Sequence, residues 1–301
     1  MKKYYFYTTL LAVMLIGLSV SSISTFAEES ASNVAESVLT KSELFYSKLK
    51  DYSCDLKLCN KDNQIILKGI LRFKSPNLFR LDASNLYEEK QIAKILFVID
   101  GVNMYSVRTS KLTGKIAEIH NAGGIAGKTA VIKKGQPYIS VQLFTPELIK
   151  VTKATQNLSD EDLSILDLGF YLYHSMPIYN PNPVFPFQSF RKVYLLDNAG
   201  TIEDKLNQSM IIWGIIKDEF KDNSKYNEAR LPMKVKLVID AKGFISFIET
   251  YDKGTNPFSS IYYGTPVFNK GLGDTLFRYH IPLNAEVMDM AQLELEAHQS
   301  R

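Results

Sequence analysis

The stretch from Gln64 to Lys74 has the sequence Gln-Ile-Ile-Leu-Lys-Gly-Ile-Leu-Arg-Phe-Lys, in which apolar and basic side chains alternate. In an extended chain, one face would carry Leu67, Leu71 and Phe73, and the other Lys68, Arg72 and Lys74. A period of two residues is that of a β-strand. A strand with one apolar and one polar face is typical of an antiparallel sheet that is covered on one side only. This stretch therefore predicts a mainly β protein with a one-sided core.

The same period recurs along most of the chain, and short turns separate the strands. Val235, Leu237 and Ile239 alternate with lysines. Asp100-Gly101 and Ala241-Lys242-Gly243 are hairpin turns in which Gly accepts a positive φ. Such short connections favour an antiparallel meander over helical crossovers. We predict about eleven strands, at residues 52–59, 64–74, 78–82, 92–99, 103–108, 115–119, 193–196, 210–217, 233–240, 244–251 and 276–281.

Helices are expected mainly at the start and in the middle of the chain. Residues 31–50 repeat apolar side chains at near-helical spacing, at Val34, Val38, Phe45 and Leu49. A short helix is predicted over 159–168. Ser159 would be its N-cap, and three acidic residues fill its first turn, where the helix dipole favours negative charge.

Two segments have the composition of irregular structure. Residues 120–137 are rich in Gly and predict a mobile loop. Residues 170–190 mix aromatic residues with four prolines, which excludes a regular element through the whole segment. That segment could be a lid, a partner surface or an ordinary packed loop. Neither an internal repeat nor a compositional linker is found, so residues 28–301 are expected to form a single domain.

The N-terminus is typical of a secretory signal peptide. Lys2 and Lys3 precede an apolar run from Leu10 to Leu18, and Thr25-Phe26-Ala27 has small residues at the positions that signal peptidase requires. We predict a signal peptide over residues 1–27 with cleavage near Ala27, and a mature protein outside the cytoplasm. The alternative, a transmembrane anchor, is disfavoured because the run falls short of the ~20 residues of a bilayer span.

The charge balance argues against a nucleic-acid partner. Cleavage near Ala27 would remove two lysines and no acid, which leaves 33 of the 35 basic side chains against 32 acidic ones. A nucleic-acid-binding domain would carry a basic stripe or a strong positive excess. This nearly neutral chain also has no net electrostatic attraction to an anionic membrane surface.

The two cysteines are expected to be free. Cys54 and Cys59 both lie in the strand predicted at 52–59. Five strand residues span roughly 16 Å, whereas a disulfide needs Cα atoms within about 7 Å of each other. We predict buried thiols, with pairing between two chains as the alternative.

No motif predicts an enzyme. The segment near Gly127 lacks the first Gly of a phosphate-binding loop, since position 122 is Ala. The four histidines are scattered, with no pair at metal-ligand spacing. No Gly-x-Ser-x-Gly elbow occurs, and residues 160–162 are acids of a helix start. We expect no catalytic residue, no metal and no cofactor, and keep a hydrolase with an unrecognised site as a remaining alternative.

Four motifs, in order, resemble the LolA family of bacterial lipoprotein carriers. The first is Gly69-Ile-Leu-Arg-Phe-Lys-Ser-Pro-Asn-Leu-Phe79, and the second is Ile99-Asp-Gly101 followed by Met104-Tyr105. The third is the strand pair over 236–249, and the last is Phe277-Arg-Tyr-His-Ile-Pro282 followed by residues 285–289. The resemblance covers roughly residues 35–290 and is loose over 120–230.

The resemblance implies a fold and a function. The fold would be an eleven-stranded antiparallel open half-barrel, with an N-terminal helix and short lid helices around an apolar cavity. The function would be that of a periplasmic, monomeric carrier. It would bind lipoprotein acyl chains or another lipid and pass them from an inner-membrane donor to an outer-membrane acceptor. The alternative is a periplasmic module on the same fold that senses lipids or lipoproteins for a regulatory partner.

The sequence departs from the family at one position. LolA proteins usually carry Arg immediately before the Pro of the first motif, where it bonds to lid carbonyls; here that residue is Ser75. A Ser hydroxyl can donate a single hydrogen bond, whereas Arg offers five donors. The candidates for lid control are therefore Ser75 itself and the neighbouring Arg72, Lys74 and Arg80. The alternatives are lid control by other contacts, or a related protein with a different cargo.

A sheet with one apolar face must cover that face. Two predicted helices are too few to cover eleven strands, so the sheet either closes tightly or leaves an apolar hollow. For each candidate lining residue, ordinary core packing is the alternative. The candidates are Leu71, Phe73, Phe79, Leu81, Phe97, Met104, Tyr105, Trp213, Leu237 and Phe247.

Overall fold

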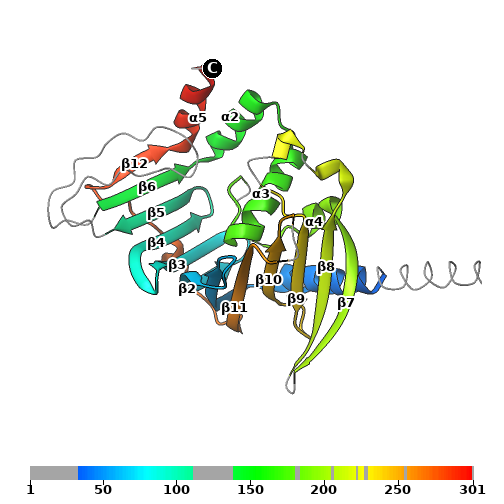
Figure 1. Ribbon diagram of the computed structural model, residues 1–301. Coiled ribbons are helices and arrows are strands. Elements are labelled where there is room, and N and C mark those ends of the chain that lie inside the picture. The colour runs from blue at the N-terminus through cyan, green and yellow to red at the C-terminus, as the bar shows by residue number, and fades with distance from the viewer. Residues whose placement is uncertain are drawn as a thin grey trace, which may run out of the picture.

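Twelve strands form one open sheet (Figure 1). The computed structural model describes residues 33–110, 138–179, 184–204, 207–221, 223–226, 230–253 and 256–299. The strand order is β12-β6-β5-β4-β3-β2-β1-β11-β10-β9-β8-β7, and all neighbours are antiparallel except the parallel pair β12 and β6. The strands are β1 (Asp51–Cys59), β2 (Ile65–Lys74), β3 (Leu78–Tyr87), β4 (Lys90–Asp100), β5 (Met104–Ser110), β6 (Tyr138–Phe144), β7 (Tyr194–Asp204), β8 (Asn207–Ile216), β9 (Lys234–Ile239), β10 (Ile245–Tyr251), β11 (Ser259–Phe268) and β12 (Glu286–Asp289).

Helices cover one face of this sheet. They are a helix over residues 33–48, α2 (Pro146–Gln156), α3 (Asp160–His174), α4 (Phe187–Val193) and α5 (Met290–Gln299). In Figure 1, α3 stands between a left wing of strands, β3–β6 with β12, and a right wing, β7–β10. We call the face that carries Leu71, Leu81 and Phe97 the inner face, and the face that carries Arg72, Asp82 and Leu96 the outer face. The expected open half-barrel with helices is confirmed.

One large apolar core joins the inner faces of both wings to the helices. Phe73 of β2, Phe79 of the left wing, Leu237 of the right wing and Leu166 of α3 belong to it. The helix over 33–48 enters the same core through Tyr46, whose ring lies 5.7 Å from that of Phe187. A second, small cluster lies on the outer face, where Val98, Tyr105, Val107 and Val141 pack beside Tyr279.

Most predicted strands are confirmed, and the differences have identifiable causes. β3 continues to Tyr87, past the predicted end at 82, although the residues that follow directly, Ala83, Ser84 and Asn85, are small or polar. The predicted strand over 276–281 is wrong: Asp274–Phe277 is a 3₁₀ turn, and Tyr279 packs against the outer-face ring of Tyr105. The strands β6, β11 and β12 and the helices α2 and α5 were not predicted.

The segment over 170–190 is more regular than predicted at both ends. α3 extends to His174 because its apolar side chains continue at helical spacing, and α4 begins at Phe187, directly after the last of the four prolines. The N-cap at Ser159 is confirmed, since its side chain accepts a hydrogen bond from the N–H of Asp162. The predicted strand over 115–119, the loop over 120–137 and the signal peptide over 1–27 lie outside the described residues.

Both cysteines lie in β1, are buried and are free, as predicted. Among the described helices, none combines the length and the apolar character that crossing a membrane requires.

Candidate functional site

Seven of the ten candidate cavity residues lie together in the large core. None of their side chains is more than 5% exposed, and cross-strand pairs connect them, such as Leu71 with Leu81 and Phe73 with Phe79. The seven are Leu71, Phe73, Phe79, Leu81, Phe97, Met104 and Leu237. The helices fill most of the space above them, so this part of the inner face is packed. Phe73 and Met104 nevertheless each border a cavity described below.

The other three candidates point to the outer face. Tyr105 belongs to the small outer cluster. Trp213 lies under the ammonium of Lys234, which is 3.8 Å from its ring centroid. Phe247 packs against Tyr262 at 4.6 Å between ring centroids. The structure therefore does not bring these three rings to the inner face, because each occupies an odd-numbered position of a strand whose even-numbered residues point inward.

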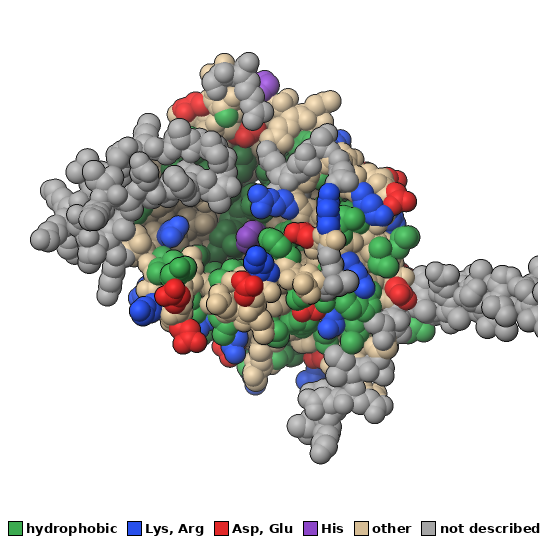
Figure 2. All heavy atoms as spheres, viewed as in Figure 1, with side chains coloured by type: hydrophobic (Ala, Val, Ile, Leu, Met, Phe, Trp, Pro, Cys, Tyr) green, Lys and Arg blue, Asp and Glu red, His purple; other side chains and the backbone are tan. Residues whose placement is uncertain are grey.

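An apolar cavity of about 480 Å³ opens between the C-terminal end of α3 and the tip of the β1–β2 hairpin. We call it the α3 cavity. Its apolar walls are Leu58, Ile66, Gly169, Phe170, Tyr173 and Phe258, with Ser259 and Asn60 beside them. Figure 2 shows this face hollowed between α3 and the strands to its left, with hydrophobic side chains on the floor of the hollow. Its volume lies within the range of about 300–1,000 Å³ that is usual for ligand sites.

The inward side chains of the sheet become smaller toward this cavity. The cross-strand row that begins at Leu58 continues through Leu67 and Asn85 to Ala93. The neighbouring inward row holds Gly69 opposite Ala83. By contrast, the rows at the other end of the same strands carry Phe73 and Phe79. Small inward side chains leave volume unfilled, whereas the aromatic rows fill it.

Basic groups stand at the mouth of the α3 cavity. Lys61, His174 and Arg230 line it and are exposed. Within the described residues, no ion pair involves Lys61 or Arg230. Although part of His174 is exposed, the protein around its imidazole partly desolvates the ring and lowers its pKa, which favours the neutral ring at pH 7. The mouth thus carries two positively charged side chains, Lys61 and Arg230, above an apolar floor.

A smaller cavity of about 230 Å³ lies on the other side of one aromatic pair. Met104, Phe144, Ile149 and Tyr179 line it, between β5, α2 and the segment after α3. The ring of Tyr179 meets the ring of Phe170, a wall of the α3 cavity, with centroids 6.3 Å apart. These two rings therefore stand between the two cavities.

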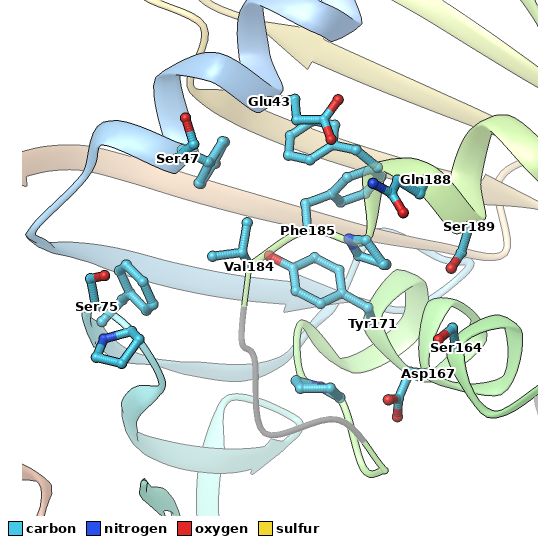
Figure 3. A pocket seen from close by; sticks show the side chains of 16 residues that line it. Glu43, Ser47, Ser75, Ser164, Asp167, Tyr171, Val184, Phe185, Gln188 and Ser189 are labelled. Carbon is cyan, nitrogen blue, oxygen red and sulfur yellow. The ribbon is translucent and has the colours of Figure 1, made fainter. Parts of the chain in front are cut away.

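Ser75 lies at a different pocket, shown in Figure 3. This pocket holds about 450 Å³ between the helix over 33–48, the β2–β3 turn, α3 and the start of α4. In Figure 3, Ser75 lies across the open space from Tyr171 and Asp167, with Val184 and Phe185 between the two sides. We call it the Ser75 pocket; it shares no lining residue with the α3 cavity.

The acids of the Ser75 pocket are already engaged. Asp167 accepts hydrogen bonds from the N–H groups of Ile178 and Tyr179, at 2.6 and 2.7 Å. Glu43 pairs with Arg191 of α4 at 2.6 Å. The bonds to Asp167 hold the segment after α3 against that helix. The ion pair of Glu43 holds the helix over 33–48 against α4. The mixed polar walls suit an acyl chain less well than the walls of the α3 cavity do.

In the described part of the chain, none of the four candidates for lid control forms a hydrogen bond to an α-helix; Lys74 and Arg80 bond instead to the 3₁₀ helix Asp274–Phe277 and the residues beside it. Arg72 and Arg80 both bind Asp82, at 2.6 and 2.8 Å. Lys74 donates to the carbonyl of Leu272, and Arg80 donates to the carbonyl of Leu276. Lys74 and Arg80 therefore fasten the segment before β12 to the outer face, whereas Arg72 bonds to Asp82 of the neighbouring strand β3. A role for them or for Ser75 in lid opening stays a prediction.

Known proteins match this chain in the structure comparison but not in the sequence comparisons. No family model and no curated protein matches it. Solved structures that match include the Mycobacterium tuberculosis lipoprotein LppX, at 12% identity over 79% of this chain and 98% of that chain, with a TM-score of 0.38. A LolA superfamily protein from Nitrosomonas europaea matches at 11% identity over 81% of this chain and 97% of that one, with a TM-score of 0.28.

A third match is a chain of the Pseudomonas aeruginosa MucA/MucB complex, at 8% identity over 83% of this chain, with a TM-score of 0.36. This chain covers 61% of that chain, less than two thirds of its length. The LolA resemblance noted in the sequence motifs thus recurs among the matched structures. Likeness at this level carries no information about what the present chain binds.

The residues that form the α3 cavity were largely missed by the sequence analysis. Leu58, Ile66, Phe258 and Arg230 come from distant parts of the chain, and none stood out locally. Phe170 and Tyr173 belong to the aromatic segment that was singled out, so that composition was the one available signal. No group of three or more His, Cys, Asp or Glu side chains suited to a metal occurs among the residues that the structure describes.

Proposed function

We propose that the protein is a periplasmic carrier that binds the acyl chain of a lipoprotein or another lipid in the α3 cavity. It would receive this cargo from an inner-membrane donor and deliver it to an outer-membrane acceptor. The observation that supports this most strongly is the combination of an apolar cavity of about 480 Å³ with Lys61 and Arg230 at its mouth. An amphiphile with an apolar chain and an anionic head fits that arrangement.

The energetics favour an acyl chain without further contacts. Burying a chain contributes about 0.8 kcal/mol per CH₂ group. Ten buried carbons would therefore contribute on the order of 8 kcal/mol, before the cost of association. An anionic head at the mouth would gain from the two cationic side chains, but exposed charge pairs contribute only about 0–1 kcal/mol each. Apolar burial thus dominates, and the charges orient the ligand.

Two neighbouring isoleucines give a matched test. Ile66 lines the α3 cavity, whereas Ile65 is 40% exposed and borders none of the cavities described here. Ile66→Glu places a carboxylate against the apolar wall, and we expect it to weaken binding of a fluorescent fatty-acid analogue by tenfold or more. Ile65→Glu should bind like the unaltered protein. Fluorescence titration measures both, and circular dichroism checks that both are folded.

Equal binding by Ile66→Glu and the unaltered protein would remove the α3 cavity as the site. Native mass spectrometry on protein from its own cell envelope tests the transport role separately. Co-purified lipoprotein would support a carrier. A co-purified membrane regulator would instead support a sensing module, and turnover of ester substrates would support a hydrolase.

A further inference from the structure

A second groove lies on the outer face of the sheet, opposite the α3 cavity. It holds about 800 Å³ between strands β1–β6 and the chain segment that leads to β12. Tyr279 and Pro282 of that segment form one wall. The outward side chains on the floor are apolar, namely Ile70, Leu96, Val107 and Ile139. We call it the outer groove.

Three lysines cross this groove in one cross-strand row. Lys57 pairs with Lys68, Lys68 pairs with Ser84, and Ser84 pairs with Lys94. All three lysines line the groove and are exposed. Side chains directly opposite each other on antiparallel strands have Cβ atoms about 4.5–5.5 Å apart, and like charges in that position are destabilising.

The acids nearby do not neutralise this row. Within the described residues, no ion pair involves Lys57, Lys68 or Lys94. Asp82, which also lines the groove, is bound by Arg72 and Arg80. Asp55 adds one further carboxylate on the neighbouring row.

The two acids are thus outnumbered by five basic side chains, namely Lys57, Lys68, Lys94, Arg72 and Arg80. A row of positive charges beside an apolar floor favours a ligand that has both an anionic group and an apolar chain. A polar anion would leave Ile70, of which 42% is exposed, and Leu96 in water. A neutral lipid would leave the lysines repelling each other. An anionic amphiphile satisfies both, with its chain on the floor and its head on the lysines.

We propose that the outer groove binds a single-chain amphiphile with a carboxylate or phosphate head. Lys57, Lys68 and Lys94 would hold the head, and Ile70, Leu96 and Tyr279 would contact the chain. The groove spans several strands, from β1 to β6, so an extended chain fits it better than a compact ligand would. This site lies on the opposite face from the α3 cavity, and neither proposal depends on the other.

The test uses a photoactivatable palmitate analogue with a diazirine on its chain, bound to the full-length protein. After irradiation, peptide mapping locates the label. We expect one labelled set around Ile70, Val107 and Tyr279, distinct from any label near Phe170. The uncharged glycerol ester of the same analogue should label the outer groove at least tenfold less, since it lacks the anionic head. Inorganic phosphate alone should not displace the label, because it lacks the chain.

Charge-matched variants separate the head contact from general attraction. The pair Lys68→Gln with Lys94→Gln should reduce outer-groove labelling about tenfold or more, the loss expected for removing charge-assisted bonds. The control pair, Lys48→Gln with Lys90→Gln, removes the same charge from exposed positions outside the groove and should leave labelling unchanged. Thermal unfolding checks that both pairs are folded.

Three results would overturn the proposal. One is label found only around the α3 cavity. Another is equal outer-groove labelling of the two lysine pairs. The third is protein that sediments with phosphatidylglycerol vesicles through these lysines but captures no single-chain probe, which would indicate a membrane-docking surface.

Discussion

The rings of Phe170 and Tyr179 meet edge to face, with centroids 6.3 Å apart, at the boundary between the α3 cavity and the smaller cavity beside Met104. Phe170 comes from α3, and Tyr179 from the segment that Asp167 fastens through two backbone N–H groups. The length of acyl chain that the protein accepts should therefore depend on this ring pair.

Phe170→Ala should join the two cavities. The removed ring leaves a passage, so a longer acyl chain can bury more CH₂ groups, each contributing about 0.8 kcal/mol. We expect the preferred chain length in a fatty-acid series to increase by several carbons. Calorimetric titration across the series measures it. Tyr87→Ala is the control, because that side chain is 64% exposed and borders neither cavity. An unchanged length preference in Phe170→Ala would show that the rings do not limit the site.

The strands with regular alternation could be predicted from sequence, whereas β11 could not. It contains Gly264 and Pro266, which both argue against a strand. In the structure, a bulge in the pairing of β1 with β11 falls between Ser53 and Asp55, opposite this part of β11. A bulge takes a residue out of the ladder, so a Pro without an N–H can be accommodated there. That tolerance depends on the partner strand and is not visible in the local sequence.

The candidate site was harder to predict than the fold. Alternation identifies which side chains point inward, but it does not say which of them the helices cover. Leu71 and Leu237 share a pattern with Leu58, yet the first two are packed and Leu58 borders a cavity. The difference arises from where α3 crosses the sheet, and from Phe258 and Arg230, which approach from 200 and 172 positions further along the chain than Leu58.

Gly69, the first residue of the family-like motif, should not tolerate a side chain. A Cβ at this position would lie 2.2 Å from the carbonyl oxygen of Asp82 and 2.6 Å from the Cα of Ala83. These are backbone atoms of β3, so relief requires moving a central strand. We expect Gly69→Ala to lower the free energy of unfolding by about 1–3 kcal/mol, the usual cost of overpacking, as measured by urea denaturation.

Gly273→Ala is the matched control for Gly69→Ala. Its Cβ would find Thr275 Oγ1 at 3.7 Å, an ordinary contact. Equal unfolding midpoints for the two variants would mean that β2 and β3 can separate at Gly69 without cost.

Asp162 should make stability depend on pH in the acid range. Burial alone would raise the pKa of this carboxyl, but hydrogen bonds from Lys225, Ser159 and Tyr226 outweigh burial and hold the pKa well below its usual value. Because the unfolded chain has a pKa of about 3.9, the stabilisation is complete well above that pH. It is lost as the pH falls through 3.9 toward the lower folded-state pKa.

Asp162→Asn should therefore flatten the acid limb of the stability curve. The variant removes the ionised partner of Lys225 and weakens the capping box with Ser159, so we expect a loss of about 1–3 kcal/mol at pH 7. The difference from the unaltered protein should shrink between about pH 5 and pH 2. Denaturant titrations at several pH values measure both curves. Parallel curves over that range would contradict the lowered pKa.

The two thiols should react slowly or not at all in the native protein, and readily after unfolding. Burial, and secondarily the charge of Asp55, raises the pKa of the Cys54 thiol to about 12, and burial also raises that of Cys59. Since the thiolate is the reactive form, we expect an aromatic disulfide reagent at pH 8 to leave Cys54 unmodified and Cys59 slow. In guanidinium without reductant, both should react, because neither is held in a disulfide. We therefore expect to count two free thiols in guanidinium and none that reacts rapidly in the native state. A count of zero in guanidinium would contradict this prediction; because the extended strand β1 cannot accommodate a bond between Cys54 and Cys59, it would indicate pairing between two chains.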